Sequence, residues 1–410
     1  MKKKLIYAGY DLGNSAYSAI IITFITSTYF ANAVVGNPQL GQAYLQWTLA
    51  LSGFVVAILS LFLGIVADRL KSGKILMLRV FTLGCIISTL FFWFIKPEKD
   101  YIFFALLIFF ISNVCYEIGI VFYDSLLKQS SENKNLGKTS GFAYGLGYFG
   151  TVPILFLILY TFIVPEIPPF GLKKELAEHI RFVPLIVSIW FLIFSFPLLI
   201  NLGKIIQVKI KSKSSGLKRL KNLFWKKGLT ITGRFLIARL FYNDALTVLI
   251  GGGGVYAAGV FLYDFSGLLE LAVYANLAAF LGAVCFGFLN DKYGSSKIII
   301  TSIIILLITV VWGSIAKSKT EFLFVVIILG LMLGPIQSAS RVMMSKLIST
   351  EDLGKGFALY AMTGKITAFI GPLLVGTVTY FTSQRIGFFS VSVLLILGLF
   401  FIYPLRNLKK

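Results

Sequence analysis

The chain has 410 residues, of which 57% are hydrophobic and only 13% charged, and its mean hydropathy is +0.87. Soluble domains carry about 25% charged residues, so this composition excludes a water-soluble globule. The net charge of +21 suits either nucleic acid or an anionic membrane surface. One histidine, His179, and three isolated cysteines offer little material for metal-dependent or triad chemistry. We therefore expect no enzyme, no metal site and no cofactor.

Apolar runs long enough to cross a membrane recur along the chain, because a spanning helix needs about 20 apolar residues. They lie at about 8–34, 44–66, 75–95, 101–127, 140–163, 182–201, 233–262, 269–289, 298–316, 321–345, 354–381 and 386–405. The first run is longer than a removable signal sequence and contains Asp11 and Asn14, so we interpret it as an uncleaved helix. The pattern predicts an all-α, polytopic membrane protein with 12 transmembrane helices.

The distribution of Lys and Arg predicts the orientation of these helices. If the N-terminus is cytoplasmic, 28 of the 38 Lys and Arg residues lie on the cytoplasmic side and 8 on the other, which predicts that both termini are cytoplasmic. The basic segment 204–230 has little aromatic interleaving, so we expect it to contact anionic lipid headgroups and no nucleic acid. It would link an N-terminal half, 1–203, to a C-terminal half, 231–410.

An internal repeat supports this division into halves. The pattern G-x-x-x-D-[RK], followed by Gly and Lys, occurs after the second and the eighth predicted helix, at an offset of 223 residues. Two copies at equivalent positions indicate two six-helix halves. The Gly allows a neighbouring helix to approach, the Asp can accept hydrogen bonds from a helix start, and the cations can hold headgroups. These gating residues are Gly64, Asp68, Arg69 and Lys74 in the first copy and Gly287, Asp291, Lys292 and Lys297 in the second.

The repeated loop motif resembles that of the Major Facilitator superfamily. More narrowly, the chain resembles the subfamily that includes the fungal vacuolar amino-acid effluxers and their bacterial relatives. The similar segments include Tyr10-Asp11-Leu-Gly-Asn14-Ser15, Phe122-Tyr123-Asp124-Ser125, Ser140-Gly-Phe-Ala-Tyr144-Gly145, Phe241-Tyr242-Asn243-Asp244, Gln337-Ser338-Ala-Ser340-Arg341 and Tyr360-Ala-Met-Thr-Gly364-Lys365.

This resemblance implies the Major Facilitator fold and secondary transport by alternating access, with amino-acid efflux as the first expectation. It also implies that helices one, four, seven and ten line a central cavity. Asp68 would meet the start of helix eleven near Lys355, and by the repeat Asp291 would meet the start of helix five near Ser140. The expected partners are a small-molecule substrate, membrane lipids and possible coupling protons, for a monomer in a bacterial inner membrane.

Ionisable and amide side chains inside the apolar runs are the candidate binding residues, because each is costly in hydrocarbon. Arg239 and Asn243 share one face of helix seven, while Asp244 points about 100° away. Lys365 in helix eleven lies at a similar depth, so we expect an ion pair between Asp244 and Lys365. The other candidates are Asn14, Asn113, Glu117, Gln337 and Arg341, and Asp11 and Asp124 are expected gating residues near the cytoplasmic ends of their helices.

Several alternatives remain open at this point. Each of these polar residues could instead form a structural contact between helices. Gly251–Gly254 predict a bend or break in helix seven, with close packing as the alternative. Glu117 is the first candidate for a proton carrier. Drug or sugar carriers of the same fold would show similar groups, and a sensor or scaffold without transport is a further alternative.

Overall fold

The computed structural model describes residues 2–70, 72–205, 221–263, 265–365 and 367–408. Within these ranges, twelve helical segments are long and apolar enough to cross a membrane, which confirms the predicted number of spans and the all-α class. Their bounds are Lys3–Val34, Leu40–Arg69, Gly73–Phe94, Lys99–Ser125, Asn133–Ile163, Glu178–Ile200, Ile231–Phe261, Glu270–Tyr293, Ser295–Ile315, Lys319–Leu347, Thr350–Phe381 and Gln384–Leu405.

The chain divides into two compact units. The first comprises 1–126 and 146–210, and the second comprises 127–145 and 211–410. The start of helix α7 (Leu136–Ile158) therefore groups with the C-terminal helices and its remainder with the N-terminal helices. Most of the predicted basic linker, 206–220, lies outside the described residues.

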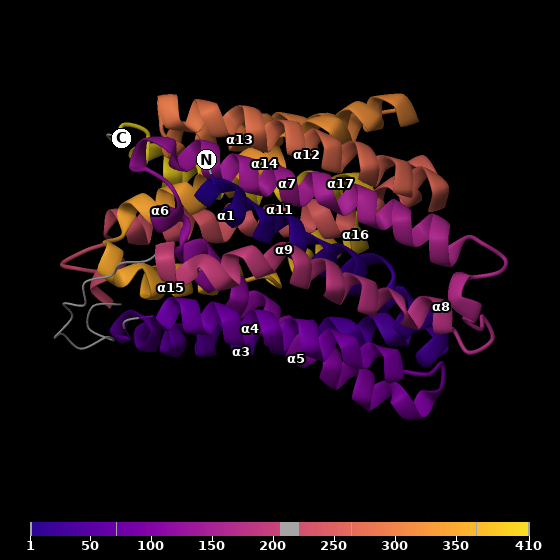
Figure 1. The fold of residues 1–410 in the computed structure, drawn as a ribbon. Coiled ribbons are helices and arrows are strands. Elements are labelled where there is room, and N and C mark those ends of the chain that lie inside the picture. Colours follow the sequence, from indigo (N-terminus) through magenta and orange to yellow (C-terminus); the bar gives the residue numbers. More distant parts are fainter. Residues whose placement is uncertain (1, 71, 206–220, 264, 366, 409–410) are drawn as a thin grey trace. The chain divides into compact units, whose positions relative to one another are not determined.

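The first unit contains α1 (Lys2–Ala16), α3 (Pro38–Arg69), α4 (Gly73–Leu90), α5 (Ile102–Ser125), α8 (Glu178–Arg181) and α9 (Val183–Ile205). Helices α3, α4 and α5 lie side by side, and α1 packs against α9 (Figure 1). Beyond α1 the first span continues through wider π-helical turns at Tyr17–Phe24 and Phe30–Val34, which flank the short α2 (Thr26–Tyr29). Hydrogen bonds from the Tyr17 hydroxyl to Ser112 and between Tyr10 and Thr82, both 2.8 Å, attach this irregular span to α5 and α4.

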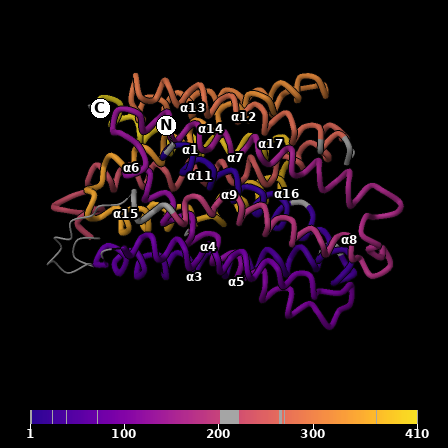
Figure 2. Tube along the Cα trace, viewed as in Figure 1, coloured from indigo at the N-terminus to yellow at the C-terminus, as the bar shows by residue number. Residues whose placement is uncertain are grey.

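The second unit contains α6 (Leu127–Ser130) and the helices α11 (Ile231–Phe261), α12 (Phe265–Tyr293), α13 (Ser295–Ile315), α14 (Lys319–Leu347), α15 (Leu353–Lys365), α16 (Ile370–Phe381) and α17 (Gln384–Ile402). Side-chain oxygens of Thr230, Ser318 and Ser383 accept hydrogen bonds from N–H groups at the starts of α11, α14 and α17. These caps satisfy N–H groups that have no partner within the helix. In the trace, α12, α13 and α14 run lengthwise beside one another (Figure 2).

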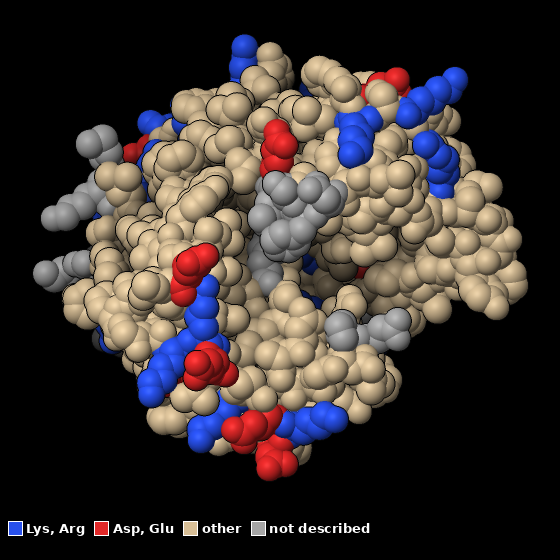
Figure 3. Space-filling view, turned by 90° about the vertical axis from the view of Figure 1, so that its right-hand side faces the viewer, with Lys and Arg blue, Asp and Glu red and all other residues tan. Residues whose placement is uncertain are grey.

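Small residues bring the helices of the second unit close together. A Cβ atom at Gly330 of α14 would lie 2.5 Å from the Ala275 carbonyl oxygen of α12, and one at Gly282 of α12 would collide with the Leu331 carbonyl of α14. Close van der Waals packing of this kind holds helices together in a membrane, because burying apolar side chains away from lipid gives no hydrophobic gain. Large apolar side chains instead remain exposed over the surface of the chain. Accordingly, most atoms visible in Figure 3 belong to uncharged residues, and Lys, Arg, Asp and Glu stand in small groups.

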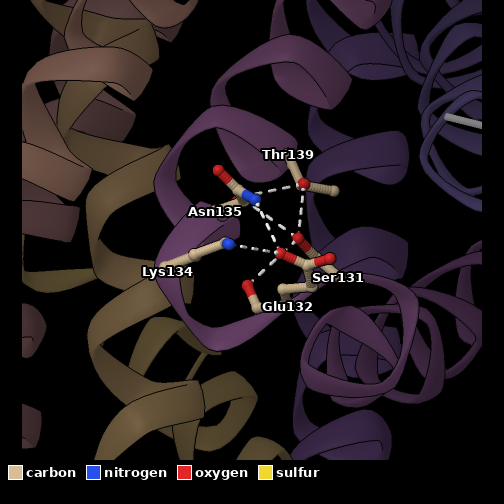
Figure 4. Close-up of polar contacts among 5 residues, drawn as sticks. All are labelled: Ser131, Glu132, Lys134, Asn135 and Thr139. Carbon is tan, nitrogen blue, oxygen red and sulfur yellow. Dashed lines mark hydrogen bonds and ion pairs between the residues drawn. The ribbon is translucent and has the colours of Figure 1, made fainter.

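The connection between α6 and α7 is a turn held by its own polar side chains (Figure 4). The Thr139 hydroxyl donates to Ser131 Oγ at 2.7 Å and to the Asn135 carbonyl at 2.9 Å. Glu132 accepts from Asn135 Nδ2 at 3.2 Å and pairs with Lys134 at 3.4 Å. These local bonds set the position at which α7 begins.

Two expectations about helix continuity are corrected. Helix α11 runs unbroken through Gly251–Gly254, because interrupting it in lipid would expose backbone groups at several kcal/mol each, whereas a helical Gly costs about 1 kcal/mol. The close-packing alternative also fails within the second unit, since a Cβ at Gly251, Gly253 or Gly254 would meet nothing within 4 Å.

The predicted span 354–381 is present as Thr350–Phe381, but the helix within it is interrupted. Helix α15 ends at Lys365, and α16 begins at Ile370. Pro372 lacks an N–H group and its ring crowds the carbonyl four residues earlier, which weakens the helix at this point. At Gly371 a Cβ atom would lie 2.9 Å from the Asp244 carbonyl oxygen, so only Gly permits this approach of α16 to α11.

Candidate functional site

Arg239, in the first half of α11, is held by contacts with α15. Its guanidinium carbon lies 3.5 Å from the centroid of the Tyr360 ring, which is a close cation–π contact. Its Nη1 donates to the Tyr360 carbonyl at 2.6 Å and to Thr363 Oγ1 at 3.0 Å. All hydrogen bonds of this guanidinium to the described residues come from Nη1, so Nε and Nη2 are available to a ligand. The side chain is thus oriented in advance for a planar anion.

Asn243 lies one helical turn beyond Arg239 on the same face of α11. Both side chains converge on Gly364, where a Cβ atom would lie 3.1 Å from Arg239 Nη1 and 3.3 Å from Asn243 Nδ2. Neither residue is fully buried. Within the described ranges, the Asn243 side chain forms no hydrogen bond, and its backbone carbonyl accepts from Thr247. The two residues therefore offer a guanidinium and an amide on one face.

Asp244 does not form the predicted ion pair with Lys365. Its side chain is fully buried, and Oδ1 accepts a hydrogen bond from Thr367 Oγ1 at 3.2 Å. Its Oδ2 has no hydrogen-bond partner among the described residues. The physical reason is the division between α15 and α16, because it places Lys365 at the end of one helix and presents Thr367 to α11 instead.

Arg341 of α14 is buried and engaged by the start of α7. Its guanidinium lies 4.1 Å from the Tyr144 ring centroid, Nε donates to Ser140 Oγ at 3.0 Å, and Nη2 donates to the Ser140 carbonyl at 3.2 Å. The Ser140 hydroxyl in turn donates to the Ser338 carbonyl at 3.0 Å. In this conformation Arg341 is a structural contact rather than a free ligand for solute. Gln337, one turn earlier, is partly exposed.

The polar residues predicted in the first unit are mostly engaged with neighbouring groups. Asn14 donates to the Asp11 carboxylate at 3.2 Å, and Asn113 donates to Ser52 Oγ of α3 at 2.6 Å. Asp124 is buried, whereas Glu117 is partly exposed. The Asn113 amide is thus engaged by Ser52, and the roles of Asn113 and Glu117 in binding stay predictions.

The second copy of the loop motif meets α7 as predicted. The two carboxylate oxygens of Asp291 accept hydrogen bonds from the Gly137 and Lys138 backbone N–H groups, at 2.7 and 2.9 Å. A Cβ atom at Gly287 would lie 2.9 Å from the Gly137 carbonyl oxygen, which confirms that this Gly permits close approach. The predicted contact near Ser140 is thus made three residues earlier, where the first N–H groups of the helix lack intrahelical partners.

The first copy of the motif contains an ion pair within its own loop. Asp68 pairs with Lys74 of the same loop at 3.0 Å, whereas the equivalent Lys297 is exposed. Arg69 and Lys292 are also exposed, and Gly64 is buried. Lys355, the predicted partner of Asp68, pairs with Asp352 at 2.9 Å. A contact between Asp68 and Lys355 therefore stays a prediction.

A second contact joins the α6 segment to the end of α14. Lys128 Nζ donates to the Ile348 carbonyl at 3.1 Å, and a cation is favourable at the C-terminal end of a helix. Burial lowers the pKa of Lys128 below its usual value of 10.5. Together with Asp291 and Arg341, this contact docks residues 127–145 on the C-terminal helices.

Sequence reasoning missed the residues that hold the candidate ligands in place. The Tyr360 ring stacks on the Arg239 guanidinium, the Thr363 hydroxyl accepts a hydrogen bond from Arg239, and the Thr367 hydroxyl donates one to Asp244. One signal was available: Thr363 and Thr367 are hydroxyl residues four apart in an apolar run and therefore share a helix face. Within the described residues, no group of three or more His, Cys, Asp and Glu side chains is placed to hold a metal ion.

Comparison with known proteins identifies this arrangement. The solved structure of the proton:xylose symporter XylE of the Major Facilitator superfamily aligns with a TM-score of 0.75 at 12% identity, over 99% of this chain and 95% of that one. The twelve candidate spans of the described residues, the repeated Gly–Asp loop motif and similarity to an MFS-type transporter of Bacillus subtilis define a Major Facilitator transporter. The family model described as "Vacuole effluxer Atg22 like" matches residues 32–129 and 127–410, so the chain belongs to that family.

Relatives are found in bacteria and fungi. The MFS-type transporter YxiO of Bacillus subtilis is 24% identical over 403 residues, which cover 95% of this chain and 91% of the relative. Autophagy-related protein 22-1 of Aspergillus clavatus is 27% identical over 295 residues, which cover 63% of this chain and 47% of that protein. The chain is accordingly a multi-pass membrane protein that carries a small solute.

Proposed function

We propose that this transporter moves small polar solutes that carry a carboxylate, with amino acids as the first candidates and efflux as the direction. The observation that carries the proposal is Arg239, whose Nε and Nη2 remain available while Nη1 is fixed by Tyr360 and Thr363. A guanidinium oriented in this way matches the two oxygens of a carboxylate.

The neighbouring groups favour an amino acid over a neutral solute. Asn243 adds an amide that can accept from an ammonium or donate to a carboxylate. A sugar carrier needs several neutral hydrogen-bonding groups, whereas a part-exposed Arg without a carboxylate partner suits an anionic group. The family description names efflux from a vacuole, which is movement out of a compartment; efflux from the bacterial cell is therefore proposed by analogy with the word effluxer alone, and transport assays in both directions test it.

The proposal includes the setting of the protein. The excess of Lys and Arg on one side supports cytoplasmic termini, and we propose further that the protein acts as a monomer in a bacterial inner membrane. Arg69, Lys292 and Lys297 are exposed in the loop motifs, where they can contact anionic headgroups. The halves alternate access to the solute, and Asp68, Asp291, Asp11 and Asp124 act at the gates.

Counterflow in proteoliposomes tests this proposal. Purified protein is reconstituted with each of the twenty amino acids inside the vesicles, and entry of the same labelled amino acid is measured, with labelled xylose and a cationic dye as other solute classes. Counterflow of at least one amino acid supports the proposal. Counterflow of xylose or the dye alone favours the sugar or drug alternative, and no flux of any solute favours the sensor alternative.

Arg239→Gln then tests the assigned residue. The loss of one or two charge-assisted hydrogen bonds, each about 1.5–3 kcal/mol, should raise the half-saturating amino-acid concentration at least about tenfold. Arg234→Gln is the matched control, because Arg234 lies near the start of the same helix. An unchanged half-saturating concentration in Arg239→Gln would remove Arg239 from the binding site.

A further inference from the structure

Asp244 combines complete burial with an oxygen that has no hydrogen-bond partner in the described part of the chain. It lies in the middle of α11, its side chain is fully buried, and Oδ2 receives no hydrogen bond from any described residue. Burying an ionised carboxylate without pairing costs several kcal/mol. A carboxylate left in this state in a transporter needs a compensating ligand that the fold itself does not supply.

The charged and titratable groups around Asp244 are engaged elsewhere. On α11, Arg239 faces α15, and the Tyr242 hydroxyl bonds with Ser340 of α14 at 2.7 Å. On α15, Tyr360 lies under Arg239, and Lys365 forms no ion pair with Asp244. Helix α16 contains no Lys, Arg, Asp, Glu or His. The charged residues of α14 and α17 bind elsewhere or lie near the helix ends, as with Arg341 at Ser140 and Arg385 at the Ser314 carbonyl.

The size of the site limits the ligand. Solute cannot contact a side chain that is fully buried, and a metal cation would need more oxygen ligands than Asp244 and Thr367 provide. A proton needs only the unoccupied Oδ2. Protonation would remove the buried charge and supply an O–H group at the same position.

We propose that Asp244 carries the proton that couples transport to a pH gradient, and that Thr367 and Thr363 link its protonation to Arg239. This inference rests on the proposed transport of a carboxylate solute. It replaces Glu117, the carrier expected from the sequence, because Glu117 is only partly buried.

The hydrogen bonds that connect Asp244 to Arg239 run from Thr367, just after α15, back to Thr363 in the last turn of that helix. The Thr367 hydroxyl has one hydrogen and two acceptors, Asp244 Oδ1 at 3.2 Å and the Thr363 carbonyl at 3.5 Å. An ionised Asp244 attracts this hydrogen strongly, whereas a neutral Asp244 releases it to the Thr363 carbonyl. The hydroxyl of the same Thr363 accepts from Arg239 Nη1 at 3.0 Å and donates to the Tyr360 carbonyl at 2.8 Å.

The division between α15 and α16 allows this switch to move the chain. Thr367 lies in the connection between the two helices, where the Ile370 N–H donates to the Thr367 carbonyl at 2.8 Å. In one cycle, movement of the helices opens Asp244 to water on one side, where Oδ2 binds a proton, and after the alternation the proton leaves to water on the other side. No other bond is made or broken.

Infrared spectroscopy on the full chain in lipid vesicles tests the proton site without a substrate. All 17 Asp and Glu side chains absorb in this region when they are protonated, so the spectrum of Asp244→Asn is subtracted from that of wild type at each pH. The difference should contain the C=O stretching band of one protonated carboxylic acid, and this band should disappear at high pH. The same band should appear when Asp244→Asn is compared with wild type in a Glu117→Gln background. A difference spectrum without this band would overturn the assignment.

Transport measurements test the link. With one proton exchanged for each solute, a gradient of one pH unit sustains about a tenfold concentration ratio. Using an amino acid that shows counterflow in wild type, this ratio should fall to about one in Asp244→Asn and in Thr367→Val. The matched control is Thr309→Val, because the buried Thr309 hydroxyl also donates four residues back, to the Ile305 carbonyl at 2.7 Å, and its only described hydrogen bond is to this carbonyl.

The outcomes separate the two proposals. If Asp244→Asn does not fold, comparing Thr367→Val with Thr309→Val still decides whether the link exists. An equal solute concentration ratio in these two variants would refute the link. If the infrared band titrates as expected but no amino acid is transported, the proton site stands and the proposed substrate fails. If amino acids move at a ratio independent of pH, the proposed function stands and the coupling fails.

Discussion

The contact between Asp291 and the start of α7 makes the sharpest quantitative prediction. The carboxylate accepts from two backbone N–H groups, those of Gly137 and Lys138, at 2.7 and 2.9 Å. Hydrogen bonds to a charged group contribute about 1.5–3 kcal/mol, against about 1 kcal/mol for neutral ones, and a negative charge at a helix start adds about 0.3–1 kcal/mol. Asp291→Asn keeps one acceptor oxygen but turns an NH₂ group toward the other N–H, so docking of α7 should weaken by about 2–3 kcal/mol.

Hydrogen–deuterium exchange measures this loss directly. Amides in the first turns of α7, residues 137–141, should exchange about 30- to 150-fold faster in Asp291→Asn, because each 1.4 kcal/mol is a factor of ten in the opening equilibrium. Lys292→Gln is the matched control, since Lys292 is the exposed neighbour of Asp291. Equal exchange at 137–141 in Asp291→Asn and wild type would refute the docking role of the carboxylate. Transport turnover should fall in Asp291→Asn, and still more with Asp68→Asn added, while solute affinity stays within about twofold.

Two further predictions concern the spans of the second unit. Replacing Gly251, Gly253 or Gly254 by Ala should raise the free energy of unfolding in detergent by about 0.5–1 kcal/mol for each substitution. The reason is that α11 is an intact helix at these positions and a Cβ atom there meets no neighbour. A lower free energy of unfolding would show that these glycines are needed for packing. In a double-mutant cycle of Asp244→Asn and Lys365→Met, the interaction energy from thermal unfolding should stay below about 0.5 kcal/mol, since the two residues form no ion pair. A coupling of about 3 kcal/mol would instead restore the pair that the sequence suggested.

The repeat fixes which residue types stand in the two loops, but not every contact that they make. Asp68 and Asp291 are 223 residues apart and precede equivalent lysines, Lys74 and Lys297. In the first copy the Lys pairs with its Asp, and in the second the Asp binds backbone N–H groups while the Lys is exposed. The motif therefore predicts the carboxylate, and only the structure shows the groups that the Asp291 carboxylate binds.

Much of the architecture follows from composition and periodicity. Twelve apolar runs are present in the sequence and in the structure, because a chain in hydrocarbon must satisfy its backbone groups within helices. The repeat and the resemblance led to the correct superfamily and family. Spacing along one helix was also reliable, since Arg239 and Asn243 share a face as their separation of four residues requires.

Contacts between helices could not be predicted from the sequence. Matching depth suggested that Asp244 and Lys365 would pair, but depth does not specify how each helix is rotated or where it ends. The division before Ile370 turned Thr367 toward Asp244 and left Lys365 on another helix end. A glycine run that suggested a bend remained helical, because backbone hydrogen bonding in lipid outweighs the cost of glycine. The sequence by itself determined the number of helices, the faces within each helix and the family; tertiary structure alone decided which polar groups meet, because those contacts depend on helix rotation, on packing at small residues and on where each helix ends.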